Sequence, residues 1–353
     1  MLGAQNRVAV ISRVMAIWFA CLGMAACNEE AKAQVTKPMT KIVIHTYPGS
    51  LISLYPYLGI DLGFYKQEGL DASTLDLNSG PEANAALAGG SIQFVLNTSD
   101  NLILAKARGL AVISVVGNQT RNFYSLIVRK DLNIPDKATL KDVAEALNGR
   151  RVGINAAGTN GERFAQSLIL AGGVDPKNVT FIAVGAPPSA LAAFSSNNID
   201  AAFSWEPFQA VSVLKGIGRI AIDCRVAGQC PAALEKPGRA FQTYYTTKAF
   251  LDSNKEAVEG FIRAHQKINA WVHDPHNRDA LVASVKKLLP PPGGGDIDPT
   301  AYAEKVIDGS LDAFGVTIDP AGLDAWNEQL MNAKLISAPV NVTDILWTGA
   351  PKP

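Results

Sequence analysis

Apolar and polar positions follow a repeating order along residues 41–246. A short apolar run of the kind that forms a buried strand is followed by a polar turn, and then by apolar positions at helical spacing. The strands expected from this order lie at 41–45, 70–77, 92–96, 112–116, 123–128, 152–154, 179–184, 200–204 and 241–246. Strands that alternate with helices are typical of an α/β fold, in which helices cover a parallel sheet. Because 353 residues are too many for one simple core, we expect two such lobes.

Several of the polar turns have the composition of a helix N-terminus. Their first and fourth residues match a capping box. In this motif the hydroxyl of the first residue accepts a hydrogen bond from the backbone N–H of the fourth, and the carboxylate of the fourth accepts one from the backbone N–H of the first. The four candidate boxes are Ser79–Glu82, Thr139–Asp142, Thr159–Glu162 and Ser253–Glu256. The N–H groups at such helix starts can hold a polar or anionic group. Ligands bind at the carboxyl ends of parallel strands, so these turns are candidate ligand contacts; the alternative is that they are ordinary capped turns.

The first 26 residues have the pattern of a signal peptide. Arg7 and Arg13 form a positive segment before an apolar run over 14–26, which is too short to span a bilayer and has the length of a signal core. The run ends at Cys27 in a sequence that resembles a bacterial lipobox, so lipid attachment to Cys27 would tether the mature chain. The alternative is cleavage after Ala33 and release as a soluble protein. In both cases we expect the protein in the periplasm, either free or anchored to the membrane.

Composition and cysteine content narrow the class of protein further. Hydrophobic residues make up 48% of the chain, which indicates a globular fold, and a formal net charge of zero gives no reason to expect a nucleic-acid partner. Cys224 and Cys230 are close in sequence, and in an oxidising compartment we expect a disulfide between them worth roughly 2–3 kcal/mol. The alternative is two free thiols. No histidine or second cysteine pair lies nearby in sequence, so we expect no metal there.

Four segments resemble one family, the bacterial periplasmic substrate-binding proteins of the nitrate, sulfonate and taurine type within the wider NMT1/THI5-like group. These segments are 57–70, 124–131, 147–154 and 199–208. The resemblance implies an α/β, two-lobed type II periplasmic-binding-protein fold, in which each lobe is a mainly parallel sheet flanked by helices and two crossing strands join the lobes. The expected order is a signal peptide over 1–26, a tether over 27–38, lobe 1 over 39–122, lobe 2 over 123–240, and a return strand with the rest of lobe 1 over 241–353.

The same resemblance implies a function. Such a protein would capture a small organic, anionic molecule between its lobes and deliver it to the permease of an ABC transporter, whose ATPase supplies the energy. It would act as a monomer, with no cofactor, no metal and no catalytic residue. Two alternatives remain open, namely a thiamine-pyrimidine enzyme of the wider group and a periplasmic sensor that presents bound solute to a membrane receptor.

The ligand contacts that the resemblance implies lie at the ends of the expected strands. They are Tyr47, Ser50, Ser79, Asn97, Thr98 and Ser99 in the first lobe, and Gly158, Thr159, Asn160, Trp205 and Glu206 in the second. Hydroxyl and backbone N–H groups suit an oxyanion, and Tyr47 and Trp205 could stack on a flat or apolar body. The alternatives are that the Ser and Thr residues only cap helices and that Trp205 belongs to the core. For Arg121 and Arg163, solvated or structural roles are favoured over contact with an anion.

Overall fold

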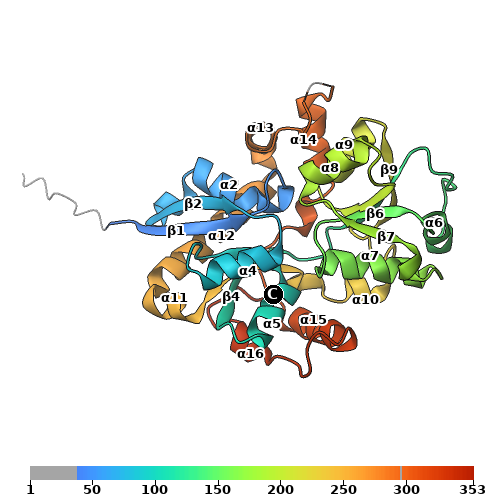
Figure 1. Ribbon diagram of the computed structural model, residues 1–353. Helices are drawn as coiled ribbons and strands as arrows, with labels where there is room; N and C mark the ends of the chain where they lie inside the picture. Colours follow the sequence, from blue (N-terminus) through green and yellow to red (C-terminus); the bar gives the residue numbers. More distant parts are fainter. Residues whose placement is uncertain (1–37, 295) are drawn as a thin grey trace, which may run out of the picture. The chain divides into compact units, whose positions relative to one another are not determined.

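Three β-sheets organise the part of the chain that the computed structural model describes, residues 38–294 and 296–353 (Figure 1). Two of the sheets belong to the first lobe. One pairs β1 (Thr40–Thr46) with β2 (Leu70–Asp76), and the other has the order β3 (Val95–Thr98), β10 (Gln242–Thr247), β4 (Val112–Gln119). The third sheet belongs to the second lobe and has the order β7 (Thr180–Ala183), β6 (Arg151–Ile154), β8 (Ala201–Ser204), β5 (Ser125–Arg129), β9 (Gly218–Asp223).

The first lobe combines parallel strands with one antiparallel strand from late in the chain. β1 and β2 are parallel, and a bridge between Ile44 and Phe94 links β1 to the segment that leads into β3. β10 lies between β3 and β4 and is antiparallel to both. The helical elements that precede β4 are η1 (Leu51–Ser53), α2 (Leu54–Asp61), α3 (Phe64–Gln67), α4 (Gly80–Ala88) and α5 (Ser99–Ala107).

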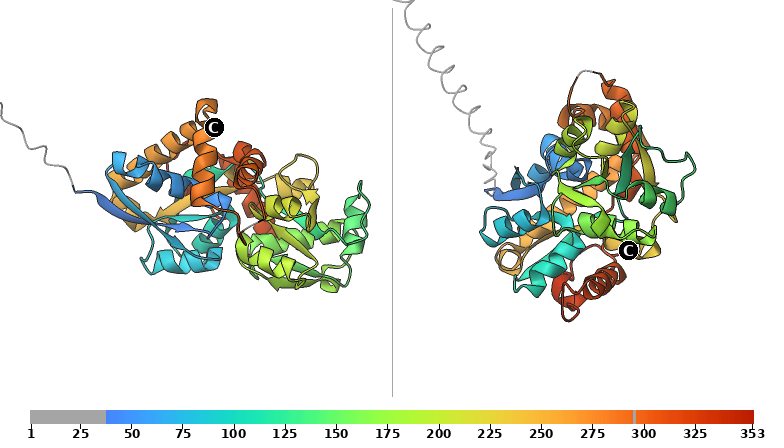
Figure 2. Two further views of the ribbon diagram at one scale, coloured as in Figure 1. Left: turned by 90° about the horizontal axis from the view of Figure 1, so that it is seen from above. Right: turned by 45° about the vertical axis from the view of Figure 1, so that its right-hand side comes forward.

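The second lobe is built around the five-stranded sheet, whose strands appear in green and yellow in both views of Figure 2. β6 is parallel to β7 and β8, whereas β5 is antiparallel to β8 and β9. The helical elements of this lobe are α6 (Leu140–Ala146), α7 (Asn160–Ala171), η2 (Pro176–Asn178), α8 (Pro187–Ser195) and α9 (Phe208–Leu214), and α10 (Ala232–Glu235) and η3 (Gly238–Ala240) lie in the segment that leads from β9 to β10. β9 was missed by the apolar pattern, because it is an edge strand whose side chains are mostly only half-buried.

β10 brings the chain back to the first lobe, and the described chain after it is mainly helical and packs on both lobes. Its elements are α11 (Lys248–Ser253), α12 (Lys255–His273), η4 (Pro275–Asn277), α13 (Arg278–Leu288), α14 (Pro299–Asp308), η5 (Leu311–Ala313), α15 (Pro320–Asn332) and α16 (Val342–Ile345). α12 packs on α2, α3 and β4, and both α15 and α16 pack on α5, whereas α14 contacts α9 of the second lobe. The chain passes between the two groups of strands through residues 120–124 and again through 224–241. The two-lobed α/β fold is therefore confirmed, while the exact lobe boundaries stay a prediction.

Two of the expected capping boxes form, one completely and one in part. At α6, Thr139 accepts from the Asp142 N–H while the Asp142 carboxylate accepts from the Thr139 N–H, which is a full capping box. At α4, Ser79 accepts from the Glu82 N–H, but the Glu82 carboxylate accepts from the N–H of Asn78 rather than from that of Ser79. Both carboxylates satisfy backbone donors that the helix itself cannot pair.

The other two expected boxes are wrong. Thr159 precedes α7 but donates its hydroxyl to Asn155 Oδ1, at 3.0 Å, so it does not cap a backbone N–H. The Glu162 carboxylate instead accepts from the N–H of Gly158 at 2.7 Å. Ser253 is the last residue of α11, and the long helix α12 begins after it without a side-chain cap. The Thr159 cap fails because its hydroxyl forms a competing local hydrogen bond. The Ser253 cap fails because Ser253 belongs to the preceding helix.

The expected disulfide between Cys224 and Cys230 is present, with the two Cα atoms 5.1 Å apart. It closes the loop that follows β9. The expected signal peptide and the lipid site at Cys27 lie outside the described residues, as does all of the expected tether except Pro38. Within the described part of the chain, no helix has both the length and the apolar character needed to cross a bilayer.

A ring cluster around His265 fills the core of the first lobe. The imidazole is fully buried, and its ring centroid lies 4.1 Å from that of Phe261 and 4.5 Å from that of Tyr244. Nδ1 lies 2.9 Å from the carbonyl oxygen of Phe261, and Nε2 lies 3.5 Å from the hydroxyl of Tyr65, so the neutral ring has a partner at each nitrogen. Burial lowers the pKa of His265 from 6.5 to about 3.

The lowered pKa of His265 predicts a loss of stability in acid. The unfolded imidazole takes up a proton below pH 6.5, while the folded one resists protonation down to about pH 3, so this residue's contribution falls through that window. The free energy of unfolding of the wild type should fall between pH 7 and pH 4.5. In His265→Gln we expect this fall to be smaller by roughly 2 kcal/mol, measured by urea denaturation at each pH. His273→Gln, at the exposed end of the same helix, is the control and should leave the wild-type pH dependence in place. Equal pH dependence in wild type and His265→Gln would contradict the prediction.

Candidate functional site

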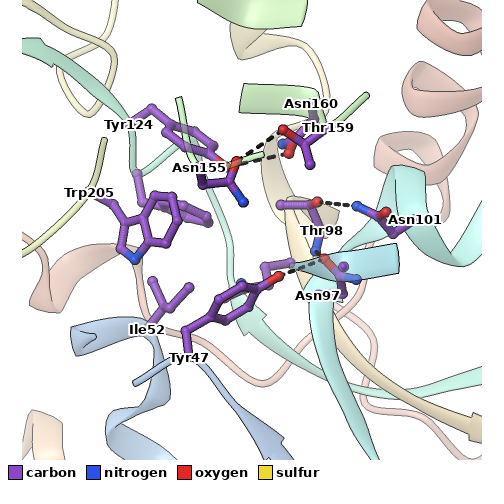
Figure 3. A pocket seen from close by; sticks show the side chains of 13 residues that line it. Tyr47, Ile52, Asn97, Thr98, Asn101, Tyr124, Asn155, Thr159, Asn160 and Trp205 are labelled. Atoms are coloured by element: carbon purple, nitrogen blue, oxygen red, sulfur yellow. Dashed lines mark hydrogen bonds between the residues drawn. The ribbon is translucent and has the colours of Figure 1, made fainter. Parts of the chain in front are cut away.

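Three helix starts meet at one cavity. α4 begins after β2, α5 follows β3 without a loop, and α7 begins after β6, so each start lies at the carboxyl end of a strand. The first two belong to the first lobe and the third belongs to the second. The cavity is lined by Tyr47, Ile52, Gly80, Asn97, Thr98, Asn101, Phe123, Tyr124, Asn155, Thr159, Asn160, Trp205 and Gln242 (Figure 3). Residues from both lobes therefore form a single site.

The described lining of this cavity is aromatic and amide-rich, and none of its side chains is charged. Four aromatic rings contribute, with the Trp205 ring centroid 5.9 Å from that of Tyr47 and 5.5 Å from that of Tyr124, edge to face in both cases. Five side-chain amides also contribute, each with an oxygen acceptor and an NH₂ donor. Such a lining can contact an apolar body and hydrogen-bond a polar group.

In the first lobe, hydrogen bonds fix the lining side chains. The Tyr47 hydroxyl donates to Asn97 Oδ1 at 3.2 Å, and Asn97 Nδ2 donates to the Tyr245 hydroxyl at 3.4 Å. Asn101 Nδ2 donates to the Thr98 hydroxyl at 3.1 Å. Burial raises the pKa of the Tyr47 hydroxyl well above its usual value, so this group remains a neutral donor. The first-lobe wall is thus a preformed network.

In the second lobe, one lining donor is left over. The Tyr124 hydroxyl donates to Asn160 Oδ1 at 3.4 Å, and Thr159 bonds to Asn155 (Figure 3). Asn160 is only 3% exposed, and its Nδ2 has no hydrogen-bond partner among the described residues. Because a buried amide donor without a partner is costly, Asn160 Nδ2 is a candidate contact for a ligand.

The cavity is tight. The centre of a water molecule can occupy only about 10 Å³ of it, which is roughly the space that one water needs. A ligand larger than a water can therefore be accommodated only if the walls move apart. Since the walls come from different lobes, movement of the lobes is the direct way to open the site.

Six of the eleven predicted contacts line the cavity, namely Tyr47, Asn97, Thr98, Thr159, Asn160 and Trp205. The other five do not. Ser50 accepts a hydrogen bond from Trp205 Nε1, Ser79 caps α4, and the hydroxyl of Ser99 is buried with no partner among the described residues. Gly158 donates its N–H to Glu162, and Glu206 pairs with Arg225. Ligand binding by any of the eleven stays a prediction.

Glu206 supports the site from behind the cavity wall. Its Oε1 accepts from Arg225 at 2.8 Å and its Oε2 accepts from the N–H of Ala210 at 3.0 Å. Burial raises the pKa of the Glu206 carboxyl to about 7, and the Arg225 guanidinium opposes that rise. Arg225 is itself held by Asp223 and by the carbonyl oxygen of Gly309. The cluster fixes the segment that carries Trp205.

Sequence reasoning missed seven lining residues: Ile52, Gly80, Asn101, Phe123, Tyr124, Asn155 and Gln242. Gly80, Asn101 and Asn155 lie one, two and three positions from the nearest predicted contacts, so they could have been found by widening each candidate turn by up to three positions. Phe123 and Tyr124 lie in the crossing segment, and Gln242 starts β10. Their place at the cavity depends on how distant strands pair, and no local pattern signals it. In the described part of the chain, no group of three or more His, Cys, Asp or Glu side chains could hold a metal ion.

Comparison with known proteins gives relatives of two kinds. The chain is 25% identical over 230 residues to the taurine-binding periplasmic protein of Escherichia coli, a match that covers 63% of this chain and 66% of that protein. It is 24% identical over 220 residues to the 4-amino-5-hydroxymethyl-2-methylpyrimidine phosphate synthase THI5 of Saccharomyces cerevisiae, covering 61% of this chain and 62% of the synthase. Parts of this chain are therefore similar in sequence both to a binding protein and to a synthase.

The fold and the family are shown by two further matches. The alkanesulfonate-binding protein SsuA from Xanthomonas axonopodis, bound to MOPS, aligns with a TM-score of 0.68 at 16% identity, over 88% of this chain and 98% of that one. At that identity the likeness concerns the fold. The sequence model described as NMT1/THI5 like matches residues 54–277, which is more than half of the chain. The chain therefore belongs to the NMT1/THI5-like family.

Proposed function

We propose that this protein is an extracytoplasmic solute-binding protein. It captures a small organic molecule with an anionic group between its two lobes and delivers it to the permease of an ABC transporter, whose ATPase drives uptake. The observation that supports this proposal most directly is the meeting of three helix N-termini from two lobes around one cavity, where Asn160 has a free donor. The relatives named for taurine and alkanesulfonate binding point in the same direction.

The helix starts favour an anionic group. Each helix N-terminus carries a partial positive charge of about half an elementary charge, together with backbone N–H groups that lack partners within the helix. α4 and α5 have nine residues each and α7 has twelve, so each is long enough to contribute. Among the described residues, the lining has no cationic side chain, so the positive field is modest. This suits a single sulfonate or carboxylate group held by neutral donors.

The aromatic residues favour an apolar body on the ligand. Tyr47 from the first lobe and Trp205 from the second contribute rings to the same cavity, along with Phe123 and Tyr124. Such rings contribute apolar contact at low entropic cost. The ligand would therefore have its oxyanion near Asn160 and its apolar part near the rings.

The alternative function is a synthase, because a relative carries that name. A reaction that forms a pyrimidine requires acid–base or nucleophilic groups at the site. The described lining contains no His, Cys, Lys, Asp or Glu. That lining supports binding without chemical change, and recovery of an altered ligand after incubation with the protein would contradict the proposal.

A thermal-shift screen of the exported, mature protein tests the ligand class. The panel contains taurine, alkanesulfonates, nitrate, aromatic carboxylates and sulfonates, and thiamine pyrimidines. A ligand at 100 times its dissociation constant should add about 2.7 kcal/mol to the free energy of unfolding. We expect one anionic class to raise the melting temperature and to be recovered unchanged. Binding restricted to cations would contradict the anionic assignment.

Asn160→Ala should weaken binding of the ligand found in that screen. Loss of a hydrogen bond to a charged group costs about 1.5–3 kcal/mol, which corresponds to a rise in the dissociation constant of roughly 10-fold to 100-fold by titration calorimetry. Asn198→Ala, at an exposed position after α8, is the matched control and should bind as the wild type does. If Asn160→Ala bound the ligand with wild-type affinity, Asn160 would not be a ligand contact.

Gly80→Ala should also weaken binding, for a steric reason. A Cβ atom at Gly80 would lie 2.5 Å from Asn97 Nδ2 and 2.8 Å from Asn101 Oδ1, so both lining amides would have to move. We expect about a tenfold loss of affinity with little change in melting temperature, because the displaced atoms are the ends of side chains. Gly89→Ala, at the other end of α4, is the control, since its Cβ would come no closer than 3.4 Å to the nearest atom. Equal affinity in the two variants would contradict the assignment of this wall.

A further inference from the structure

The contacts that join the lobes beside the cavity include two polar sets. On one side, Trp205 Nε1 donates to the Ser50 hydroxyl, and the N–H of Leu51 donates to the carbonyl oxygen of Glu206 at 3.2 Å. On the other side, Arg163 of α7 forms an ion pair with Asp100 of α5. The first set consists of neutral hydrogen bonds, whereas the second brings together opposite charges from different lobes.

The Asp100–Arg163 pair is largely buried. The Asp100 side chain is 1% exposed and that of Arg163 is 20% exposed. Most ion pairs found on protein surfaces contribute little, because water already solvates both charges. A carboxylate that has lost almost all of its water depends on its partner, and removing that partner leaves an uncompensated buried charge.

The pair is also linked to the cavity wall on both sides. Asn101 donates to Asp100 Oδ1 at 3.3 Å, and Asn101 lines the cavity. Arg163 Nη1 donates to the carbonyl oxygen of Gly158 at 3.0 Å, next to the lining residue Thr159. Neither Asp100 nor Arg163 is itself a lining residue. The pair therefore connects the two polar walls without forming part of either.

We propose that the Asp100–Arg163 ion pair is a closing contact between the lobes, which sets the spacing of the two cavity walls and raises ligand affinity without touching the ligand. When the lobes part, both charges regain water. When the lobes close, both lose it, and each then depends on the other. Asp100 and Arg163 are thus positioning residues that favour the closed arrangement in which the amides of both walls face one ligand.

The first test needs no ligand and compares the radius of gyration of the unliganded variants by small-angle X-ray scattering. Arg163→Gln leaves Asp100 buried without its counter-charge, so we expect the open form to gain population and the radius of gyration to rise. The double variant Asp100→Asn with Arg163→Gln has no uncompensated charge to bury but also lacks the ion pair, so we expect its radius of gyration to lie between those of Arg163→Gln and the wild type. Asp100→Asn alone leaves the partly exposed Arg163 in contact with water, so it should open less than Arg163→Gln does.

A matched control is available within the second lobe. Arg151 Nε donates to Asp200 Oδ2 at 3.0 Å, and both residues belong to the β6–β8 region of one sheet. Arg151→Gln removes the same type of charge from a pair inside one lobe. It should lower the melting temperature without changing the radius of gyration. The same increase in Arg151→Gln and Arg163→Gln would overturn the proposal.

The second test rests on the proposed function and uses the ligand found in the thermal-shift screen. We expect Arg163→Gln to weaken binding roughly tenfold, since the ligand must then supply more of the closing free energy. The double variant should recover to within about threefold of the wild type. Equally weak binding in the single and double variants would mean that Arg163 contacts the ligand directly and would overturn the proposal. The scattering result does not depend on a ligand, so failure of the proposed function and failure of the closing contact give different outcomes.

Discussion

The site depends on the backbone N–H groups at helix N-termini, which need hydrogen-bond partners outside the helix. A helix leaves its first N–H groups unpaired, and the strand-to-helix turns of this fold place three such ends at one cavity. β3 runs directly into α5 at Thr98 and Ser99, so no loop residues lie between the sheet and the helix start. The surrounding Asn, Thr and Tyr side chains form hydrogen bonds with each other, which leaves Asn160 Nδ2 without a partner among the described residues.

Much of this architecture could be predicted from the order of apolar and polar positions, because strands and helices differ in period and their alternation indicates an α/β fold. β9 escaped because an edge strand with half-buried side chains lacks a continuous apolar run. Thr159 was assigned to a cap because spacing alone cannot show whether a hydroxyl accepts or donates, and Asn155 provides a competing acceptor.

The composition of the cavity was only partly predictable. Residues at the turns after each strand could be identified one by one, since their position depends on local structure. Gln242 and Tyr124 could not, because they reach the site through the pairing of β10 and through the crossing segment. The ion-pair partner of Arg163 could not be predicted either, because Asp100 lies 63 positions earlier and in the opposite lobe. Long-range pairing leaves no trace in a local window.

The tightness of the cavity has a consequence for transport. Under the proposed function, a protein whose lobes closed without solute would present to the permease the same outer surface as a loaded one. Empty copies would then compete with loaded copies for a limited number of docking sites. Uptake at low solute concentration would then depend on the ratio of loaded to empty protein as well as on the affinity of the site.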